Sequence, residues 1–130
     1  YQAAILAELS GEVYTIEREA PLMERAKDLL RKLGYKNIHF KVGDGTLGWP
    51  EEAPFDRIIV TAAAPEIPPP LKDQLAVSGI MVIPVGERYN QVLLQVKRKE
   101  KEVFDIKELF ECAFVPLIGA YGFNPEVSDF

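Results

Sequence analysis

The sequence predicts an α/β fold in which a parallel sheet ends in an antiparallel edge. Its 130 residues are 48% hydrophobic and 27% charged, values typical of one soluble globular domain. Short runs of β-branched and aromatic residues alternate with stretches whose apolar residues recur at three- and four-residue spacing. Near the end of the chain, two apolar runs follow each other with only a charged segment between them. Alternation predicts parallel strands with helical crossovers, and the closing pair predicts an antiparallel hairpin.

The first half of the chain shows this alternation. Residues 3–9 form a short helical stretch with Ile5, Leu6 and Leu9 on one side, followed by a strand over residues 13–16. A second helix begins near Pro21, since proline suits the first helical position, and ends at Gly34, a typical left-handed cap. Its expected inner face consists of Leu22, Ala26, Leu29, Leu30 and Leu33. Residues 38–42 form the next strand.

The second half adds strands without long helices. Residues 58–60 are continuously apolar, as expected of a strand covered on both faces. A short helix over residues 70–75 follows a run of prolines, and residues 80–83 form another buried strand. Residues 92–96 and 103–106 are expected to pair antiparallel, with the charged residues 97–102 as the solvated turn between them.

Composition excludes several classes of protein. Fifteen basic against twenty acidic side chains give a net charge of −5, which argues against nucleic acid as a partner. No apolar run reaches the length of about 18 residues that a membrane helix needs, and no secretory leader is visible, so a cytoplasmic protein is expected. The lone Cys112 excludes an intrachain disulfide and a cysteine zinc site. The lone His39 lies in a predicted strand, where a structural role is expected.

Two acidic residues and a run of small residues follow the predicted parallel strands. Glu17 comes after the first strand, Asp44 stands between two glycines after the second, and residues 61–65 come after the third. Because ligands of open α/β sheets bind at the carboxyl ends of the strands, these segments are expected to share one edge.

Each of these segments has two interpretations. Glu17 either accepts hydrogen bonds from a ribose diol or is a solvated acid at a strand end. Asp44 either binds an amino group of a purine or belongs to a tight Gly-Asp-Gly turn. Trp49 flanks a base or covers the core. The run 62–65, Ala-Ala-Ala-Pro, lets a substrate backbone approach or simply makes a tight connection.

The start of the chain is abrupt for such a fold. In a doubly wound sheet, a helix in the position of residues 3–9 follows a first strand that lies at the sheet centre. No such strand precedes it here. We therefore expect residues 1–130 to be the carboxyl-terminal majority of a larger domain, with the first strand and its glycine-rich turn upstream of residue 1.

Several blocks, in the same order, resemble the protein-L-isoaspartate O-methyltransferase family. They are residues 12–18, 42–50, 53–68, 83–86 with Gln91, and 114–119. The resemblance extends from Tyr1 to about Phe123. Its most specific parts are Gly-Asp-Gly-Thr at residues 43–46 and Ala-Ala-Ala-Pro at residues 62–65.

The resemblance implies a Rossmann-like methyltransferase that uses S-adenosyl-L-methionine. Its substrates would be damaged proteins and peptides, methylated on the free α-carboxylate of L-isoaspartyl residues, and the complete protein would be a monomer. Glu17 would hold the ribose hydroxyls, and Asp44 and Gly45 would meet the adenine, with Arg18 nearby. The residues that would line the peptide cleft are Ala62, Ala63, Val115 and Leu117. No catalytic residue is carried over, because the family's hydroxyl residue lies upstream of residue 1.

Two other functions remain open at this point. Glu17, which would end the second strand of a complete Rossmann sheet, also suits the ribose of NAD, which would make the chain part of another Rossmann-type enzyme. Alternatively, the chain is a non-catalytic remnant that keeps a peptide cleft through Val115 and Leu117. If the 130 residues are the whole molecule, little or no methyl transfer is expected.

Overall fold

The fold of the computed structural model is described for residues 2–124. The chain divides into two compact units, Tyr1–Gly45 and Thr46–Phe130. The first unit holds α1 (Gln2–Leu9), β1 (Val13–Glu17), α2 (Ala20–Lys32) and β2 (Ile38–Val42). The second holds the 3₁₀ turn η2 (Pro50–Glu52), β3 (Phe55–Ile59), α3 (Pro69–Gln74), β4 (Leu75–Glu87), β5 (Asn90–Glu100) and β6 (Val103–Cys112). A further 3₁₀ turn, η1 (Gly45–Leu47), begins at the last residue of the first unit.

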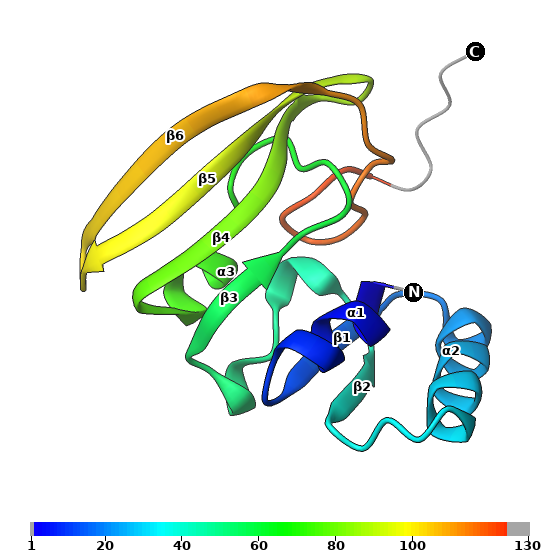
Figure 1. The fold of residues 1–130 in the computed structure, drawn as a ribbon. Helices are drawn as coiled ribbons and strands as arrows, with labels where there is room; N and C mark the ends of the chain where they lie inside the picture. Colours follow the sequence, from blue (N-terminus) through cyan, green and yellow to red (C-terminus); the bar gives the residue numbers. More distant parts are fainter. Residues whose placement is uncertain (1, 125–130) are drawn as a thin grey trace, which may run out of the picture. The chain divides into compact units, whose positions relative to one another are not determined.

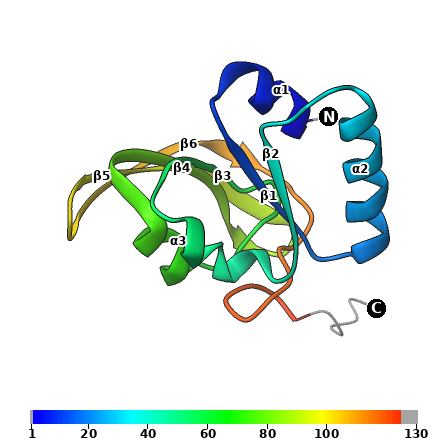
Figure 2. The same cartoon turned by 90° about the horizontal axis from the view of Figure 1, so that it is seen from below.

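The first unit is a β-α-β arrangement. β1 and β2 pair in parallel from Val13 opposite Ile38 to Glu17 opposite Val42, and Figure 2 shows them side by side. Their core contains Ala7, Val13, Leu30 and Ile38. The predicted strands and helices are confirmed, and α2 ends as expected because Gly34 adopts a φ of 92°.

The predicted inner faces of both helices are partly wrong. In α2 the buried residues are Met23 and Leu30, whereas Leu22, Leu29 and Leu33 are exposed. In α1 the buried residue is Ala7, and Leu9 is 79% exposed. A two-stranded sheet is narrow, so it covers only a thin strip of each helix.

The end of α1 is fixed by a side chain from the loop before β2. The Asn37 side-chain amide donates to the carbonyl oxygens of Ala7 at 2.9 Å and Gly11 at 3.1 Å. The Ala7 carbonyl is one of those that a helix end leaves without a partner, and the Gly11 carbonyl belongs to the segment that follows the helix. Tyr35 adds a 2.8 Å hydrogen bond from its hydroxyl to the Glu8 carboxylate, 27 residues earlier in the chain.

The second unit contains a four-stranded mixed sheet in the order β3-β4-β5-β6. β3 and β4 are parallel, whereas β4, β5 and β6 form an antiparallel meander of long strands (Figure 1). The predicted combination of parallel strands with an antiparallel edge is therefore confirmed. β4 is much longer than residues 80–83, because it continues through residues 84–87 opposite β5.

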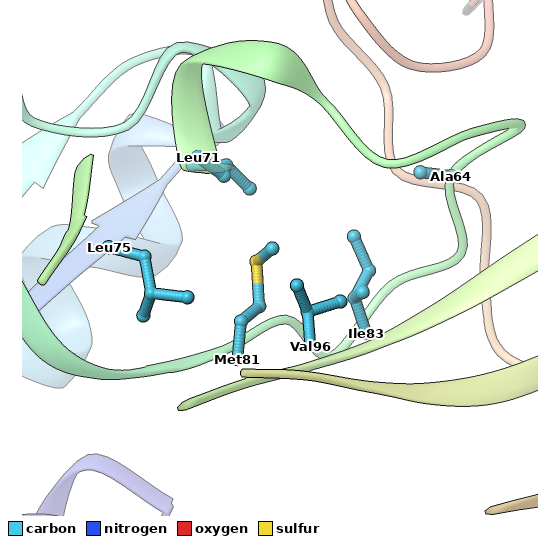
Figure 3. Packing of buried hydrophobic residues seen from close by; sticks show 6 residues of the cluster. All are labelled: Ala64, Leu71, Leu75, Met81, Ile83 and Val96. Atoms are coloured by element: carbon cyan, nitrogen blue, oxygen red, sulfur yellow. The ribbon is translucent and has the colours of Figure 1, made fainter. Parts of the chain in front are cut away.

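The core of this unit lies between α3 and one face of the sheet. Met81 and Ile83, two residues apart on β4, point to the same face, and both are fully buried. Leu71 of α3 belongs to the same cluster (Figure 3). The buried members are Ala64, Leu71, Leu75, Met81, Ile83 and Val96.

Two expectations about this sheet are wrong. Ile58 packs on the core but Ile59 is 47% exposed, so β3 is covered on one face only. The charged segment is not a turn, because β5 continues to Glu100 and only residues 101–102 turn. The Arg98 guanidinium donates to the carbonyl oxygen of Leu75 at 2.6 Å, just after α3, which gives this charged residue a partner inside the strand.

Candidate functional site

In the first unit, the ends of the parallel strands bring two candidate residues together. Glu17 is the last residue of β1, and Asp44 lies two residues beyond β2. The N–H of Gly43 donates to the carbonyl oxygen of Glu17 at 3.0 Å, which continues the ladder past β2. Glu17 and the Gly-Asp-Gly segment therefore meet at the carboxyl edge of this sheet, as predicted.

The Glu17 side chain is held by a backbone N–H two residues further along the chain. Its Oε1 accepts a hydrogen bond from the N–H of Glu19 at 3.2 Å, and the side chain is half-buried. Arg18 is exposed and lies 3.8 Å from the Glu19 carboxylate, a surface pair that contributes little to stability. A carboxylate fixed at a strand end in this way can accept hydrogen bonds from paired hydroxyl groups.

The segment after Gly45 is shaped by a buried glutamine that the sequence analysis did not single out. Gln74, at the end of α3, accepts a hydrogen bond from the N–H of Trp49 at 2.8 Å and donates to the carbonyl oxygen of Leu47 at 2.9 Å. Between them, Gly48 has a φ of 66°, and a Cβ atom there would collide with the Gln74 amide. Whether the Trp49 ring flanks a base or covers the core stays a prediction.

Thr46 of the Gly-Asp-Gly-Thr block is fully buried. Its Oγ1 accepts a hydrogen bond from the N–H of Tyr121 at 3.2 Å, 75 residues away in the chain. Thr46 thus fixes the turn that follows residues 115–118. In the sequence, only the place of Thr46 after the Gly-Asp-Gly turn pointed to this structural role.

In the second unit, the small-residue run lies between β4 and the segment 115–117. Ala64 donates to the carbonyl oxygen of Pro84 and accepts from the N–H of Gly86, both at 3.0 Å. Ala63 bonds on the other side, to the carbonyl oxygen of Val115 and the N–H of Leu117, both at 2.7 Å. The structure therefore brings Ala63, Val115 and Leu117 together, with Ala62 next to them in the chain.

These residues differ in what they offer to a ligand. Ala63 is fully buried, and its N–H and carbonyl are both used by the neighbouring segment. Val115 is 70% exposed, whereas Leu117 packs against the core cluster. Val115 is thus the residue of this set with the most accessible side chain, and the buried Ala63 holds its backbone by a hydrogen bond.

The two sets of candidates fall in different units. Glu17, Arg18, Asp44 and Gly45 belong to the first unit, and the other four belong to the second. The boundary between the two units lies within η1, between Gly45 and Thr46.

The histidine and the cysteine of the chain, His39 and Cys112, both lie outside these sets. His39 lies 2.7 Å from the Glu12 carboxylate, and its ring stacks on Tyr14 at a centroid distance of 4.6 Å. The structural role expected for His39 is therefore confirmed. Burial raises the pKa of the Cys112 thiol, which disfavours the nucleophilic thiolate.

Residues 2–124 contain neither a cluster of metal-binding side chains nor a membrane-spanning helix. Within that range, no three His, Cys, Asp or Glu side chains gather as they would around a metal ion. None of the helices there is long and apolar enough to cross a membrane.

Comparison with known proteins assigns the chain to a family. The family model for protein-L-isoaspartate(D-aspartate) O-methyltransferase matches residues 1–122. The chain belongs to this family. Among curated family members, protein-L-isoaspartate O-methyltransferase 2 of Geotalea uraniireducens is 52% identical over 126 residues, covering 97% of this chain and 58% of the relative. The enzyme of Dictyoglomus thermophilum is 56% identical, covering 95% of this chain and 56% of the relative.

Solved structures of the family share the fold. One protein-L-isoaspartate O-methyltransferase structure matches 94% of this chain and 40% of its own length, with a TM-score of 0.85 and 30% identity. A second, from Plasmodium falciparum and solved in complex with S-adenosyl-L-homocysteine, matches 82% of this chain and 52% of its own, with a TM-score of 0.71 and 29% identity. The Rossmann-like methyltransferase fold is thereby confirmed. The chain spans little more than half the length of the curated relatives it matches.

Proposed function

We propose that this chain is part of an enzyme that transfers a methyl group from S-adenosyl-L-methionine to the α-carboxylate of L-isoaspartyl residues in proteins. The family match over residues 1–122 carries the proposal. The complex of a family structure with S-adenosyl-L-homocysteine supports the choice of cofactor. The partners would be damaged proteins and peptides that contain isoaspartate, and the enzyme would act in the cytoplasm.

The cofactor would be held by residues at the strand ends of the first unit. Glu17 would accept hydrogen bonds from the ribose hydroxyls, since its carboxylate is oriented by the Glu19 N–H. Asp44 would accept from the adenine amino group, with the backbone of Gly45 against the ring and Arg18 nearby. These residues fit the cofactor, because the carboxylates of Glu17 and Asp44 accept hydrogen bonds, whereas the ribose hydroxyls and the adenine amino group donate them.

The peptide would lie against the segment that Ala63 holds. Val115 would provide the exposed apolar contact, and Leu117, Ala62 and Ala63 would form the wall behind it. The small side chain of Ala62, which is only partly buried, leaves room for a substrate backbone to approach closely.

The proposed reaction needs little acid–base help from the protein. The isoaspartyl carboxylate is already ionised near pH 7, because unperturbed carboxyl pKa values lie near 4. Its oxygen attacks the methyl carbon while the sulfur–carbon bond breaks, which leaves a methyl ester and neutral S-adenosylhomocysteine. When bound, the cofactor supplies a sulfonium that is already an activated leaving group. The enzyme then needs chiefly to align the two reactants, a contribution worth up to roughly 7–11 kcal/mol in well-oriented cases. The backbone amide nitrogen of the next residue then attacks the ester carbonyl and methanol leaves, which gives a succinimide that water reopens partly to normal aspartate.

Two measurements test the proposal. Calorimetric titration of the natural protein that carries this sequence should show binding of S-adenosylhomocysteine and none of NADH; the reverse would favour another Rossmann-type enzyme. Transfer of a labelled methyl group should occur to an isoaspartyl peptide and not to the same peptide with ordinary aspartate. Peptide binding that does not respond to cofactor, without methylation, would indicate a non-catalytic remnant.

A further inference from the structure

Gln91, near the start of β5, is a buried polar side chain whose amide nitrogen and oxygen both have hydrogen-bond partners. It is 1% exposed. Its Nε2 donates to the carbonyl oxygens of Glu87 at 2.8 Å and Arg88 at 2.9 Å, in the turn between β4 and β5. Its Oε1 accepts from the N–H of Phe114 at 2.7 Å. Two carbonyls on one side and an N–H on the other leave only one orientation of the amide.

The bond to Phe114 lies where the chain leaves the sheet. Gln91, near the start of β5, pairs with Cys112 at the end of β6, and this is the terminal pair of the β5–β6 ladder. Beyond Cys112, the strand ladder no longer fixes the backbone. The next backbone group with an anchor is the Phe114 N–H, and the anchor is the Gln91 side chain.

Four hydrogen bonds hold residues 114–117, one of them from the N–H of Phe123 to the carbonyl oxygen of Leu117 at 2.8 Å. The Phe114 N–H is held by Gln91, whereas the Val115 carbonyl and the Leu117 N–H are held by Ala63. Ala63 fixes the segment along one side, and Gln91 fixes the point at which it enters. Loss of the Gln91 side chain would free the backbone of Phe114 to shift, and the exposed Val115 directly follows Phe114.

We propose that Gln91 is a positioning residue for the isoaspartyl peptide, acting through Phe114 on the contact surface of Val115 and Leu117. Gln91 cannot touch a peptide itself, because it is buried. The inference rests on the proposed function, and it adds a residue outside the expected cleft that controls peptide affinity. A purely structural glutamine would affect stability without changing the affinity for peptide relative to cofactor.

The test compares two buried glutamines in the natural protein. Gln91→Met keeps the length and volume of the side chain but removes all three hydrogen bonds. Gln74→Met is the matched control, because Gln74 is also buried and also bonds two backbone groups, but at Leu47 and Trp49. Steady-state kinetics with an isoaspartyl peptide would give KM and kcat, with the KM for S-adenosylmethionine measured separately. Hydrogen exchange would follow residues 113–117.

Gln91→Met should raise the KM for the peptide about tenfold, the scale of one lost hydrogen bond to a group left unpaired. The KM for S-adenosylmethionine should stay within about twofold, and the amide of Phe114 should exchange faster. Gln74→Met should lose stability while the KM for the peptide stays within about twofold. If the methionine variant does not fold, Gln91→Asn serves instead. Its amide is too short to reach from the turn to Phe114, so this variant should also raise the KM for the peptide.

Parent-like peptide KM values in both Gln91 variants would overturn the inference while leaving the proposed function intact. Equal increases in the two KM values, or the same increase in Gln74→Met, would also overturn it, because they would indicate general loosening. A parent protein that neither binds nor methylates the peptide would overturn the proposed function, and the inference would fall with it.

Discussion

The backbone N–H of Ala63 donates a 2.7 Å hydrogen bond to the carbonyl oxygen of Val115. Together with the Leu117 N–H bond to the Ala63 carbonyl, it forms a short parallel bridge opposite Pro116. In such a bridge the central residue directs its own backbone groups away from its partner, so Pro116 loses nothing by lacking an N–H. The bridge joins a fully buried alanine to a valine that is 70% exposed, and the surface of Val115 therefore depends on the packing of Ala63.

Enlarging Ala63 should destabilise the second unit. Ala63 is fully buried, so Ala63→Val forces two methyl groups into packed space and should cost about 1–3 kcal/mol. Urea unfolding followed by circular dichroism would measure the loss. Ala26→Val, on an exposed position of α2, is the control and should cost less than about 1 kcal/mol. Equal effects of the two variants would contradict the close packing at Ala63.

Gly48→Ala should be destabilising for two separable reasons. The φ of 66° disfavours any residue with a Cβ, by roughly 1–2 kcal/mol, and the new methyl group would also meet the Gln74 amide. Gln74→Ala removes the second cause but not the first. A double-mutant cycle of unfolding free energies should therefore show Gly48→Ala to be less costly in the Gln74→Ala background. Strict additivity would mean that the two residues do not meet.

Ser78→Gly should stabilise the protein. Ser78 is the one non-glycine residue with positive φ in the described part of the chain, at 70°, where glycine carries no steric cost. The net gain should be about 0.5–1 kcal/mol. It is smaller than the strain that is relieved, because glycine also makes the unfolded chain more flexible. Ser10→Gly, where no positive φ is adopted, should not stabilise. Differential scanning calorimetry would compare the two variants, and a lower Tm for Ser78→Gly would contradict the prediction.

Tyr35 should make stability depend on pH in the alkaline range. The hydrogen bond to Glu8, with smaller contributions from burial and from the Glu8 charge, raises the pKa of Tyr35 above its ordinary value of 10.0. A raised folded-state pKa means that this stabilisation is complete below pH 10 and is lost as the pH rises through the folded-state pKa. The Tm should fall less steeply above pH 10 in Tyr35→Phe than in the parent. Identical slopes would show that the hydroxyl is not linked to folding.

Local sequence features predicted most of the elements but not the buried polar contacts that fix their connecting segments. The strand at residues 38–42 and the cap at Gly34 follow from β-branched runs and glycine, which act over a few residues. The inner faces of the helices were partly missed because they depend on how wide a sheet lies beneath them. The sequence analysis named Gln91 only as part of the family resemblance and did not single out Gln74. The hydrogen bonds of both were missed because their partners are backbone groups up to 27 residues away, which side-chain patterns do not predict.

Glu17→Gln should weaken cofactor binding while leaving the fold unchanged. The substitution keeps the shape of the side chain but replaces a charged acceptor, a change worth about 1–3 kcal/mol for a hydrogen bond to a charged group. Calorimetric titration of the natural protein with S-adenosylhomocysteine would measure the change in Kd. Glu24→Gln, on the exposed surface of α2, is the matched control and should keep the parent Kd. Because Oε1 of Glu17 also accepts the Glu19 N–H, the glutamine can keep that bond through its own oxygen, and the Tm should change little. An unchanged Kd would remove Glu17 from the proposed ribose site, and an equal loss in the control variant would point to an effect of net charge instead.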